Sequence, residues 1–178
     1  MSLDGLLGLG VLDPRVVVAH GVMNVKPELI RGNSIDLTVR EVYVVQGGVT
    51  LRADGSRQLP AYSLVTPDHE GFYALDPATV YQFEFEQSVD LPHWMCGITM
   101  IRSSMAKSGC SGENGLFDSG YRGSTGMMIR VGHRSYVQRG AAVAQMVFFR
   151  AHAEGALYEG FYQETSGPSE WSGSVRTT

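Results

Sequence analysis

The alternation of hydrophobic and polar residues along the chain predicts a protein built mainly from β-strands. Residues 81–86 read YQFEFE, and an aromatic side chain at every second position is typical of a strand with one buried face. We expect Tyr81, Phe83 and Phe85 to lie in the core or in a subunit interface rather than against a ligand. Other segments rich in β-branched or apolar residues are 34–45, 94–101, 127–131 and 142–149.

Turns and short helices are expected between these strands. Residues 51–64 contain polar turn residues and predict a hairpin or loop, and residues 116–126 are rich in glycine. Helices are indicated only at 3–11, which Pro14 is expected to end, and at 102–109. The pattern therefore favours short strands joined by many turns.

Composition supports the same fold class. The chain has 178 residues, of which 22 are glycine, and an excess of glycine favours turns and hairpins over long helices. We expect residues 1–178 to form a single all-β domain, a barrel or jelly roll with short helical segments.

Charge and hydropathy exclude several functional classes. The net charge is −4, so the chain lacks the basic surface of a nucleic-acid-binding protein. No apolar run reaches the roughly 18 residues that a membrane-spanning helix needs. Residues 1–12 lack the basic start of a signal peptide, and two cysteines do not make a disulfide framework. We therefore expect a cytoplasmic protein. Cys96 is expected in the core and Cys110 at the surface.

The segment 101–107, IRSSMAK, gathers hydroxyl and basic side chains. If it forms a helical turn, its hydroxyls and backbone N–H groups can bind an anion, and Arg102 and Lys107 would add charge-assisted hydrogen bonds. The alternative is an ordinary serine N-cap with solvated charges.

The segment 115–123, GLFDSGYRG, places a carboxylate in a glycine-flanked turn. Asp118 is suited to orient a water molecule, and Tyr121 is suited to stack on a sugar or a base. The alternative is a plain hairpin turn, because Asp, Ser and Gly favour turns for conformational reasons.

Gln145 is the one uncharged polar residue in an apolar segment, 139–149. Its amide either faces a ligand or has a structural partner within the fold. Asp36 is expected to be a structural carboxylate at a turn or strand end rather than a metal ligand.

Taken together, these segments resemble the superfamily of trimeric dUTP pyrophosphatases (dUTPases) and dCTP deaminases. The matching motifs, in chain order, are NSIDL at 33–37, RSSMAKSG at 102–109, GLFDSGYRG at 115–123, GAAVAQMVF at 140–148 and YEGFYQETSGP at 158–168. The resemblance implies a distorted β-barrel of jelly-roll type. It also implies a homotrimer whose active sites lie between subunits.

The resemblance further implies roles for individual residues. Asp118 matches the aspartate that activates water for attack on the α-phosphorus of dUTP, with Mg²⁺ on the triphosphate, and Tyr121 matches the aromatic ring beneath the deoxyribose. Tyr162 belongs to the Tyr-Gln pair of the deaminase-like tail. The positions that match phosphate-contacting residues are Arg102, Ser103, Ser104, Lys107 and Gln145.

One position separates the two chemistries of the superfamily. The deaminases carry a glutamate ten residues after the motif-three aspartate, and here that residue is Met128, which cannot transfer protons. Glu113 is the only nearby acidic residue that could replace this glutamate. The sequence therefore favours dUTP pyrophosphatase activity. A dCTP deaminase, a pyrophosphatase acting on dCTP or a modified pyrimidine nucleotide, and a non-catalytic nucleotide-binding regulator stay open as alternatives.

The C-terminal residues depart from the pyrophosphatase pattern. Residues 164–178 are expected to form an arm in which Trp171 replaces the family's stacking phenylalanine and Arg176 reaches phosphate. The alternative is a frayed terminus. Gly112 stands where pyrophosphatases commonly carry an asparagine near the base, so the base preference stays open.

Overall fold

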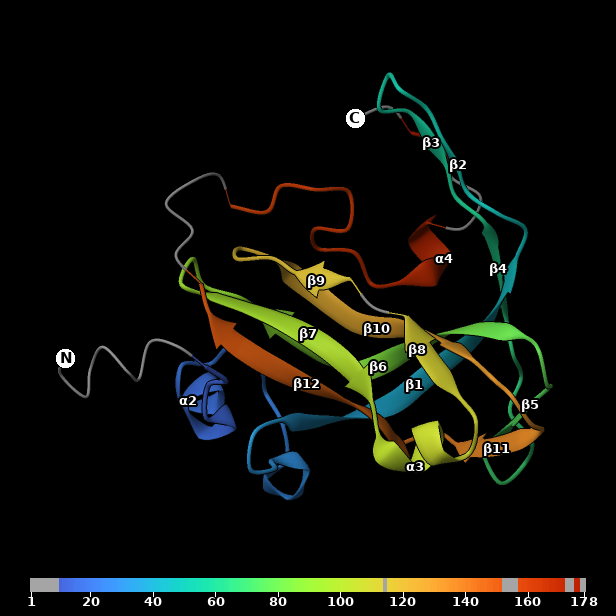
Figure 1. Cartoon of the computed structure of the whole chain (residues 1–178), viewed down its shortest axis with the longest axis horizontal. Helices are drawn as coiled ribbons and strands as arrows, with labels where there is room; N and C mark the ends of the chain where they lie inside the picture. Colours follow the sequence, from blue (N-terminus) through green and yellow to red (C-terminus); the bar gives the residue numbers. More distant parts are fainter. Residues whose placement is uncertain (1–9, 114, 152–156, 172–174, 177–178) are drawn as a thin grey trace, which may run out of the picture.

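A curled antiparallel sheet forms the body of the molecule (Figure 1). The computed structural model describes residues 10–113, 115–151, 157–171 and 175–176. The sheet has the strand order β8-β10-β6-β1-β12-β7-β9, and β4 pairs with β1 beside this path. Its strands are β1 (Ile35–Gln46), β4 (Ala61–Leu64), β6 (Val80–Asp90), β7 (Met95–Ile101), β8 (Ser111–Glu113), β9 (Leu116–Phe117), β10 (Arg122–Arg130) and β12 (Ala142–Arg150). The prediction of a mainly β fold is confirmed, and the sheet curls into a half-barrel.

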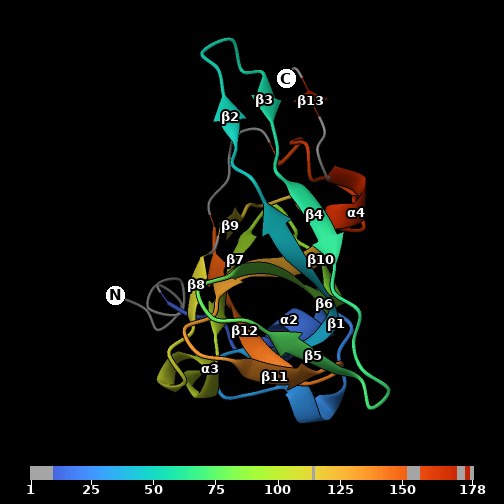
Figure 2. The ribbon, with the colours of Figure 1, turned by 90° about the vertical axis from the view of Figure 1, so that its right-hand side faces the viewer.

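Smaller sheets and short helices complete the fold. One pairs β5 (Phe72–Leu75) with β11 (Ser135–Gln138), and another joins β2 (Thr50–Leu51), β3 (Arg57–Gln58) and β13 (Val175–Arg176). Figure 2 shows the β2–β3 hairpin projecting from one end of the molecule beside β13. The helices are α2 (Pro14–Ala19), the 3-10 turn η1 (Pro27–Leu29), α3 (Ser103–Lys107) and α4 (Pro168–Trp171). No helix in the described part of the chain is both long and apolar enough to cross a membrane.

The alternation in residues 81–86 is confirmed on one face of β6 and wrong on the other. Phe83 and Phe85 are buried in the core, as expected. Gln82 and Glu84, which the alternation places on the polar face, are only 6% and 3% exposed. That face is covered by the C-terminal segment, because a side chain at Gly167 would collide with the Glu84 carboxylate.

Several local predictions are corrected by the structure. Pro14 begins α2 instead of ending a helix, because Asp13 accepts a hydrogen bond from the Arg15 N–H as the N-cap (2.9 Å) and proline suits the first helical position. Residues 3–9 of the predicted N-terminal helix lie outside the described part. The predicted locations of the two cysteines are wrong. Cys96, expected in the core, is half-buried, and Cys110, expected at the surface, is buried in the core.

Candidate active site

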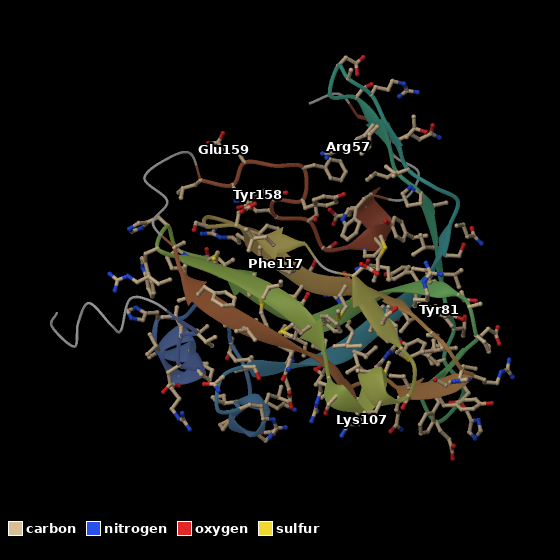
Figure 3. All side chains as sticks on the ribbon, viewed as in Figure 1. Arg57, Tyr81, Lys107, Phe117, Tyr158 and Glu159 are labelled. Carbon is tan, nitrogen blue, oxygen red and sulfur yellow. The ribbon has the colours of Figure 1, made fainter. Side chains whose placement is uncertain are left out.

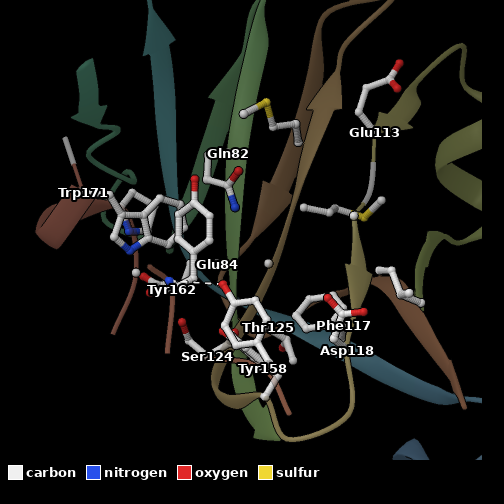
Figure 4. A pocket seen from close by; sticks show the side chains of 18 residues that line it. Gln82, Glu84, Glu113, Phe117, Asp118, Ser124, Thr125, Tyr158, Tyr162 and Trp171 are labelled. Carbon is white, nitrogen blue, oxygen red and sulfur yellow. Dashed lines mark hydrogen bonds between the residues drawn. The ribbon is translucent and has the colours of Figure 1, made fainter. Parts of the chain in front are cut away.

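A cavity of about 550 Å³ lies between the sheet and the C-terminal segment. Strands β6, β8, β9 and β10 contribute one wall, and residues from 158–171 form the other (Figure 4). Its lining includes four of the predicted site residues, Asp118, Tyr121, Tyr162 and Trp171, together with Glu113 and Met128.

Asp118 and Tyr121 lie at the two ends of one tight turn. The Tyr121 N–H donates to the Asp118 carbonyl oxygen (3.1 Å), so this segment is a turn and lines the cavity as well. Tyr121 is 7% exposed, its hydroxyl donates to the Ser124 carbonyl oxygen (2.8 Å), and its ring packs edge-on against Phe117 and Tyr158. Burial raises the pKa of Tyr121 to about 12, so the phenol stays neutral near neutral pH. The carboxylate of Asp118 is exposed.

Tyr162 and Trp171 lie at the opposite end of the cavity from Asp118 (Figure 4). Their ring centroids are 5.1 Å apart, and Trp171 also packs edge-on against Tyr62 at 5.8 Å. Burial raises the pKa of Tyr162. Trp171 lies on α4 within this aromatic cluster, so the frayed-terminus alternative is wrong for Trp171.

Glu84 is the cavity residue that the sequence analysis missed. It forms an ion pair with Arg40, and the Tyr43 hydroxyl lies 3.5 Å from its second carboxylate oxygen. Arg40 also donates to the Ser166 carbonyl oxygen (2.7 Å), which ties the C-terminal segment to the same carboxylate. Burial raises the pKa of Glu84, and the Arg40 guanidinium opposes that shift. Gly126 lies opposite Glu84 in the β6–β10 register, but a side chain there would meet Gln82 and the Phe83 carbonyl oxygen, so no local sequence signal indicates the burial of Glu84.

Met128 occupies the middle of the cavity wall. It pairs with Gln82 of β6 on one side and with Glu113 of β8 on the other. All three residues line the cavity. The position at which the deaminases carry a glutamate therefore has an amide and a carboxylate as cross-strand neighbours.

Arg102 and Gln145 belong to a second cluster, organised by Asp36. Asp36 is fully buried near the start of β1, and its Oδ2 lies 2.6 Å from Nη2 of Arg31 and 3.2 Å from Nη1 of Arg102. Gln145 is the register partner of Asp36, and its Oε1 accepts a hydrogen bond from Ser34 (3.1 Å). Gln145 thus has a structural partner through Oε1, whereas no hydrogen bond among the described residues uses Asp36 Oδ1.

The hydroxyl and ammonium groups of α3 are exposed at the same end. Ser103, Ser104 and Lys107 are all exposed. The N-cap of this helix is Arg102, and within the described part of the chain no side chain caps it. The interpretation of the serines as N-caps is therefore wrong, and their hydroxyls stay available to a ligand.

The two groups of predicted site residues lie apart in one chain. Phe117 pairs with Gly97 near the start of β7, whereas Arg102 follows its end. At roughly 3.3 Å per strand residue, this stretch spans about 16 Å. Figure 3 shows Lys107 at the opposite end of the sheet from Phe117 and Tyr158. Of the described residues that line the cavity, three are carboxylates and none is Lys, Arg or His.

Protein ligands for a metal ion are scarce in the described part. Among those residues no group of three or more His, Cys, Asp or Glu side chains could hold an ion. The cavity carboxylates Asp118, Glu113 and Glu84 line it at separate places (Figure 4).

Comparison with known proteins places the chain among nucleotide enzymes. The dCTP deaminase-like family model matches residues 14–151. The chain is 31% identical over 140 residues to a probable deoxyuridine 5'-triphosphate nucleotidohydrolase from Methanosarcina barkeri, covering 75% of this chain and 80% of the relative. A Halobacterium salinarum protein of the same description is 29% identical over 151 residues, covering 82% and 90%.

A solved structure shares the fold. The crystal structure of 2'-deoxycytidine 5'-triphosphate deaminase from Agrobacterium tumefaciens superposes with a TM-score of 0.64 at 17% identity. The match covers 82% of this chain and 49% of that one, so this chain spans about half the length of that protein.

Proposed function

The chain belongs to the dCTP deaminase-like family, and on that premise we propose that it hydrolyses dUTP to dUMP and pyrophosphate. The observation that carries the proposal is the turn at residues 118–121, which sets the Asp118 carboxylate and the buried Tyr121 ring in one cavity. Curated relatives described as probable dUTP nucleotidohydrolases support the same reaction.

In the proposed mechanism Asp118 acts as a general base. The deoxyribose packs on Tyr121, which sets the α-phosphorus beside the carboxylate. Asp118 accepts a proton from water while the water oxygen bonds to the α-phosphorus. The bond from that phosphorus to the bridging oxygen breaks, and pyrophosphate leaves. Met128, a thioether, has no role in this proton transfer.

Electrostatics favours a shared site in a homotrimer. A triphosphate carries several negative charges, and the described lining of the cavity offers only carboxylates as charged groups. Lys107 lies at the opposite end of the sheet from Phe117 (Figure 3), and it belongs to α3, which also carries Ser103 and Ser104 and begins after Arg102. We therefore propose that a neighbouring copy supplies these residues, together with Gln145, to the phosphates bound at Asp118.

Mg²⁺ is proposed to arrive with the triphosphate. Magnesium usually keeps several waters and binds through substrate phosphates and one or two carboxylates, so it does not need a cluster of protein ligands. Asp118 and Glu113 are the exposed carboxylates of the cavity that fit such an outer contact. When bound, the ion would neutralise charge that develops on the leaving pyrophosphate.

We propose that residues 1–178 form one domain, in which residues 164–178 are an arm over the site. Trp171 supports this role because it lines the cavity and packs against Tyr162. The indole ring of Trp171 would then cover the bound nucleotide from the side opposite to β6.

A second candidate is deamination of dCTP. Glu113 pairs with Met128 and lines the cavity, so a carboxylate lies next to the position that matches the deaminase glutamate. Water attack at C4 of cytosine would release ammonia, which distinguishes this reaction from pyrophosphate release.

One assay tests both reactions. Purified protein with Mg²⁺ receives dUTP or dCTP in separate reactions, and pyrophosphate and ammonia are measured in each. Pyrophosphate from dUTP without ammonia from dCTP supports the proposal. Ammonia from dCTP supports the second candidate, and pyrophosphate from dCTP alone keeps the chemistry but changes the base. No product together with nucleotide binding indicates a non-catalytic regulator.

A further inference from the structure

The cavity extends beyond the groups that the proposed reaction uses. Asp118 and Phe117 lie on one side of it, and Tyr162 and Trp171 lie on the other (Figure 4). Its volume of about 550 Å³ is in the range of pockets that hold drug-sized ligands. If the deoxyribose packs on Tyr121, the C4–C5 edge of the pyrimidine, which is remote from the sugar, faces the far side. That far side, bounded by Gln82, Glu84, Tyr162 and Trp171, is called the distal compartment below.

Two side chains of β6, Gln82 and Glu84, give the distal compartment hydrogen-bond acceptors beside the hydroxyl of Tyr162 and the indole N–H of Trp171. Gln82 donates through Nε2 to the Phe83 carbonyl oxygen (3.1 Å), which leaves its Oε1 as an acceptor. Arg40 approaches Oε1 of Glu84 from outside the cavity, and the Tyr43 hydroxyl lies 3.5 Å from Oε2, too far for a strong O–H···O bond. Oε2 of Glu84 therefore keeps accepting capacity although the side chain is 3% exposed.

Neighbouring groups favour a positive charge at the same place. The Tyr162 ring already has the Arg57 guanidinium 5.8 Å from its centroid, and the Trp171 ring, 5.1 Å from Tyr162, offers a further aromatic face. The charged side chains among the described lining residues are Glu84, Glu113 and Asp118, all negative.

We propose that the distal compartment is a subsite for an amine-bearing substituent on the C4–C5 edge of a pyrimidine deoxynucleoside triphosphate. Gln82 and Glu84 accept hydrogen bonds from the amine, and the rings of Tyr162 and Trp171 surround its carbon linker. The inference rests on the proposed function, since it assumes that the nucleotide binds with its sugar on Tyr121. It adds Gln82 and Glu84 as specificity-determining residues for that substrate class.

Three nucleotides of graded chemistry test the subsite. The kcat/KM values for 5-(3-aminoallyl)-dUTP, 5-propynyl-dUTP and dUTP are measured by pyrophosphate release. Because hydrogen bonds that involve a charged group are stronger than neutral ones, the amine is expected to be preferred over the apolar propynyl group by about tenfold or more. In Gln82→Met and Glu84→Gln this preference is expected to fall at least about threefold, whereas it should persist in Glu86→Gln, a matched change at an exposed position of the same strand.

The outcomes separate this inference from the proposed function. Hydrolysis of dUTP without a preference for the amine, or with a preference that both cavity variants retain, overturns the subsite and leaves the function intact. If none of the three nucleotides is hydrolysed or bound in calorimetry, the proposed function fails and the subsite fails with it. Glu84→Gln removes the charge that pairs with Arg40 and can weaken folding, so thermal melting is recorded for each variant. If Glu84→Gln is unfolded, the kinetic result for Gln82→Met decides the test.

Discussion

Arg102 is held in place by Asp36: Nη1 of the arginine lies 3.2 Å from Oδ2 of a carboxylate that is fully buried. The same oxygen binds Arg31 at 2.6 Å. Asp36 comes from the first motif and Arg102 from the second, so the ion pair joins the start of β1 to the start of α3. A carboxylate that the sequence indicates as structural thus orients the arginine proposed to bind phosphate.

The first prediction concerns this carboxylate. Asp36→Asn keeps the shape of the side chain but removes the charge that two arginines share. Both arginines are partly exposed and can be solvated, so we expect a loss of about 2 kcal/mol in the free energy of unfolding, below the usual cost of breaking a fully buried pair. KM for dUTP should rise more than kcat falls. Asp76→Asn, which breaks the exposed Asp76–Arg134 pair, is the matched control and should change little.

The second prediction concerns Asp118. Asp118→Asn should lower kcat by about 10²-fold or more, because general-base catalysis typically contributes that much. Binding of the non-hydrolysable α,β-imido analogue of dUTP, measured by calorimetry, should be largely retained. Glu113→Gln removes another exposed carboxylate from the same cavity and should reduce kcat far less. An active Asp118→Asn enzyme would disprove the assignment of the base.

Local sequence predicted the strands and the turn at Asp118 because their signals are short-range. The alternation in 81–86 determines which face carries Phe83 and Phe85, and the GLFDSGYRG segment is a turn in its own right. Glu84 could not be found this way, since its burial depends on Gly167, more than eighty residues further along the chain. The separation of Arg102 from Asp118 likewise follows from the path of β7, not from the motifs that contain them.

The third prediction concerns the contact between Gly167 and Glu84. A Cβ at Gly167 would collide with Oε1 of Glu84, and the φ of +128° disfavours other residues. Gly167→Ala should therefore displace α4 and raise KM for dUTP, with a change in the emission of Trp171 recorded in a Trp94→Phe background. Gly47→Ala imposes a similar backbone strain (φ +84°) where nothing lies within 4 Å of the new methyl group. Unchanged emission in Gly167→Ala would argue against tight packing of this segment on β6.

The fourth prediction is a pH dependence of stability that comes from Glu84. Burial raises its pKa in the folded state above the ordinary value of 4.5, although Arg40 opposes the shift. The folded state therefore holds this proton more tightly than the unfolded state does. The resulting contribution to stability is complete below pH 4.5 and is lost as the pH rises through the raised pKa. Arg40→Gln should steepen this loss in chemical denaturation across pH 4–7, and Glu84→Gln should remove it.

The last prediction tests whether one active site draws on two chains. Asp118→Asn and Arg102→Ala should each be inactive as pure proteins, because each lacks one half of the site. When the two variants are co-expressed with different tags and purified as mixed assemblies, some sites combine an intact Asp118 from one chain with an intact Arg102 from a neighbour. For random mixing we expect up to about one quarter of wild-type activity.

The rescue of activity is informative because a site built from the residues of a single chain predicts no rescue. If Asp118 and Arg102 of the same chain acted together, every chain in the mixture would lack one of them, and mixing would restore nothing. Co-expression of Asp118→Asn with Tyr121→Ala is the control, since both changes affect the same cavity and no mixed pair rebuilds it. Rescue in the first mixture and not in the second would assign the carboxylate and the arginine to different subunits. That result would also explain why a chain with all its site residues keeps its acidic cavity and its basic cluster at opposite ends of one sheet.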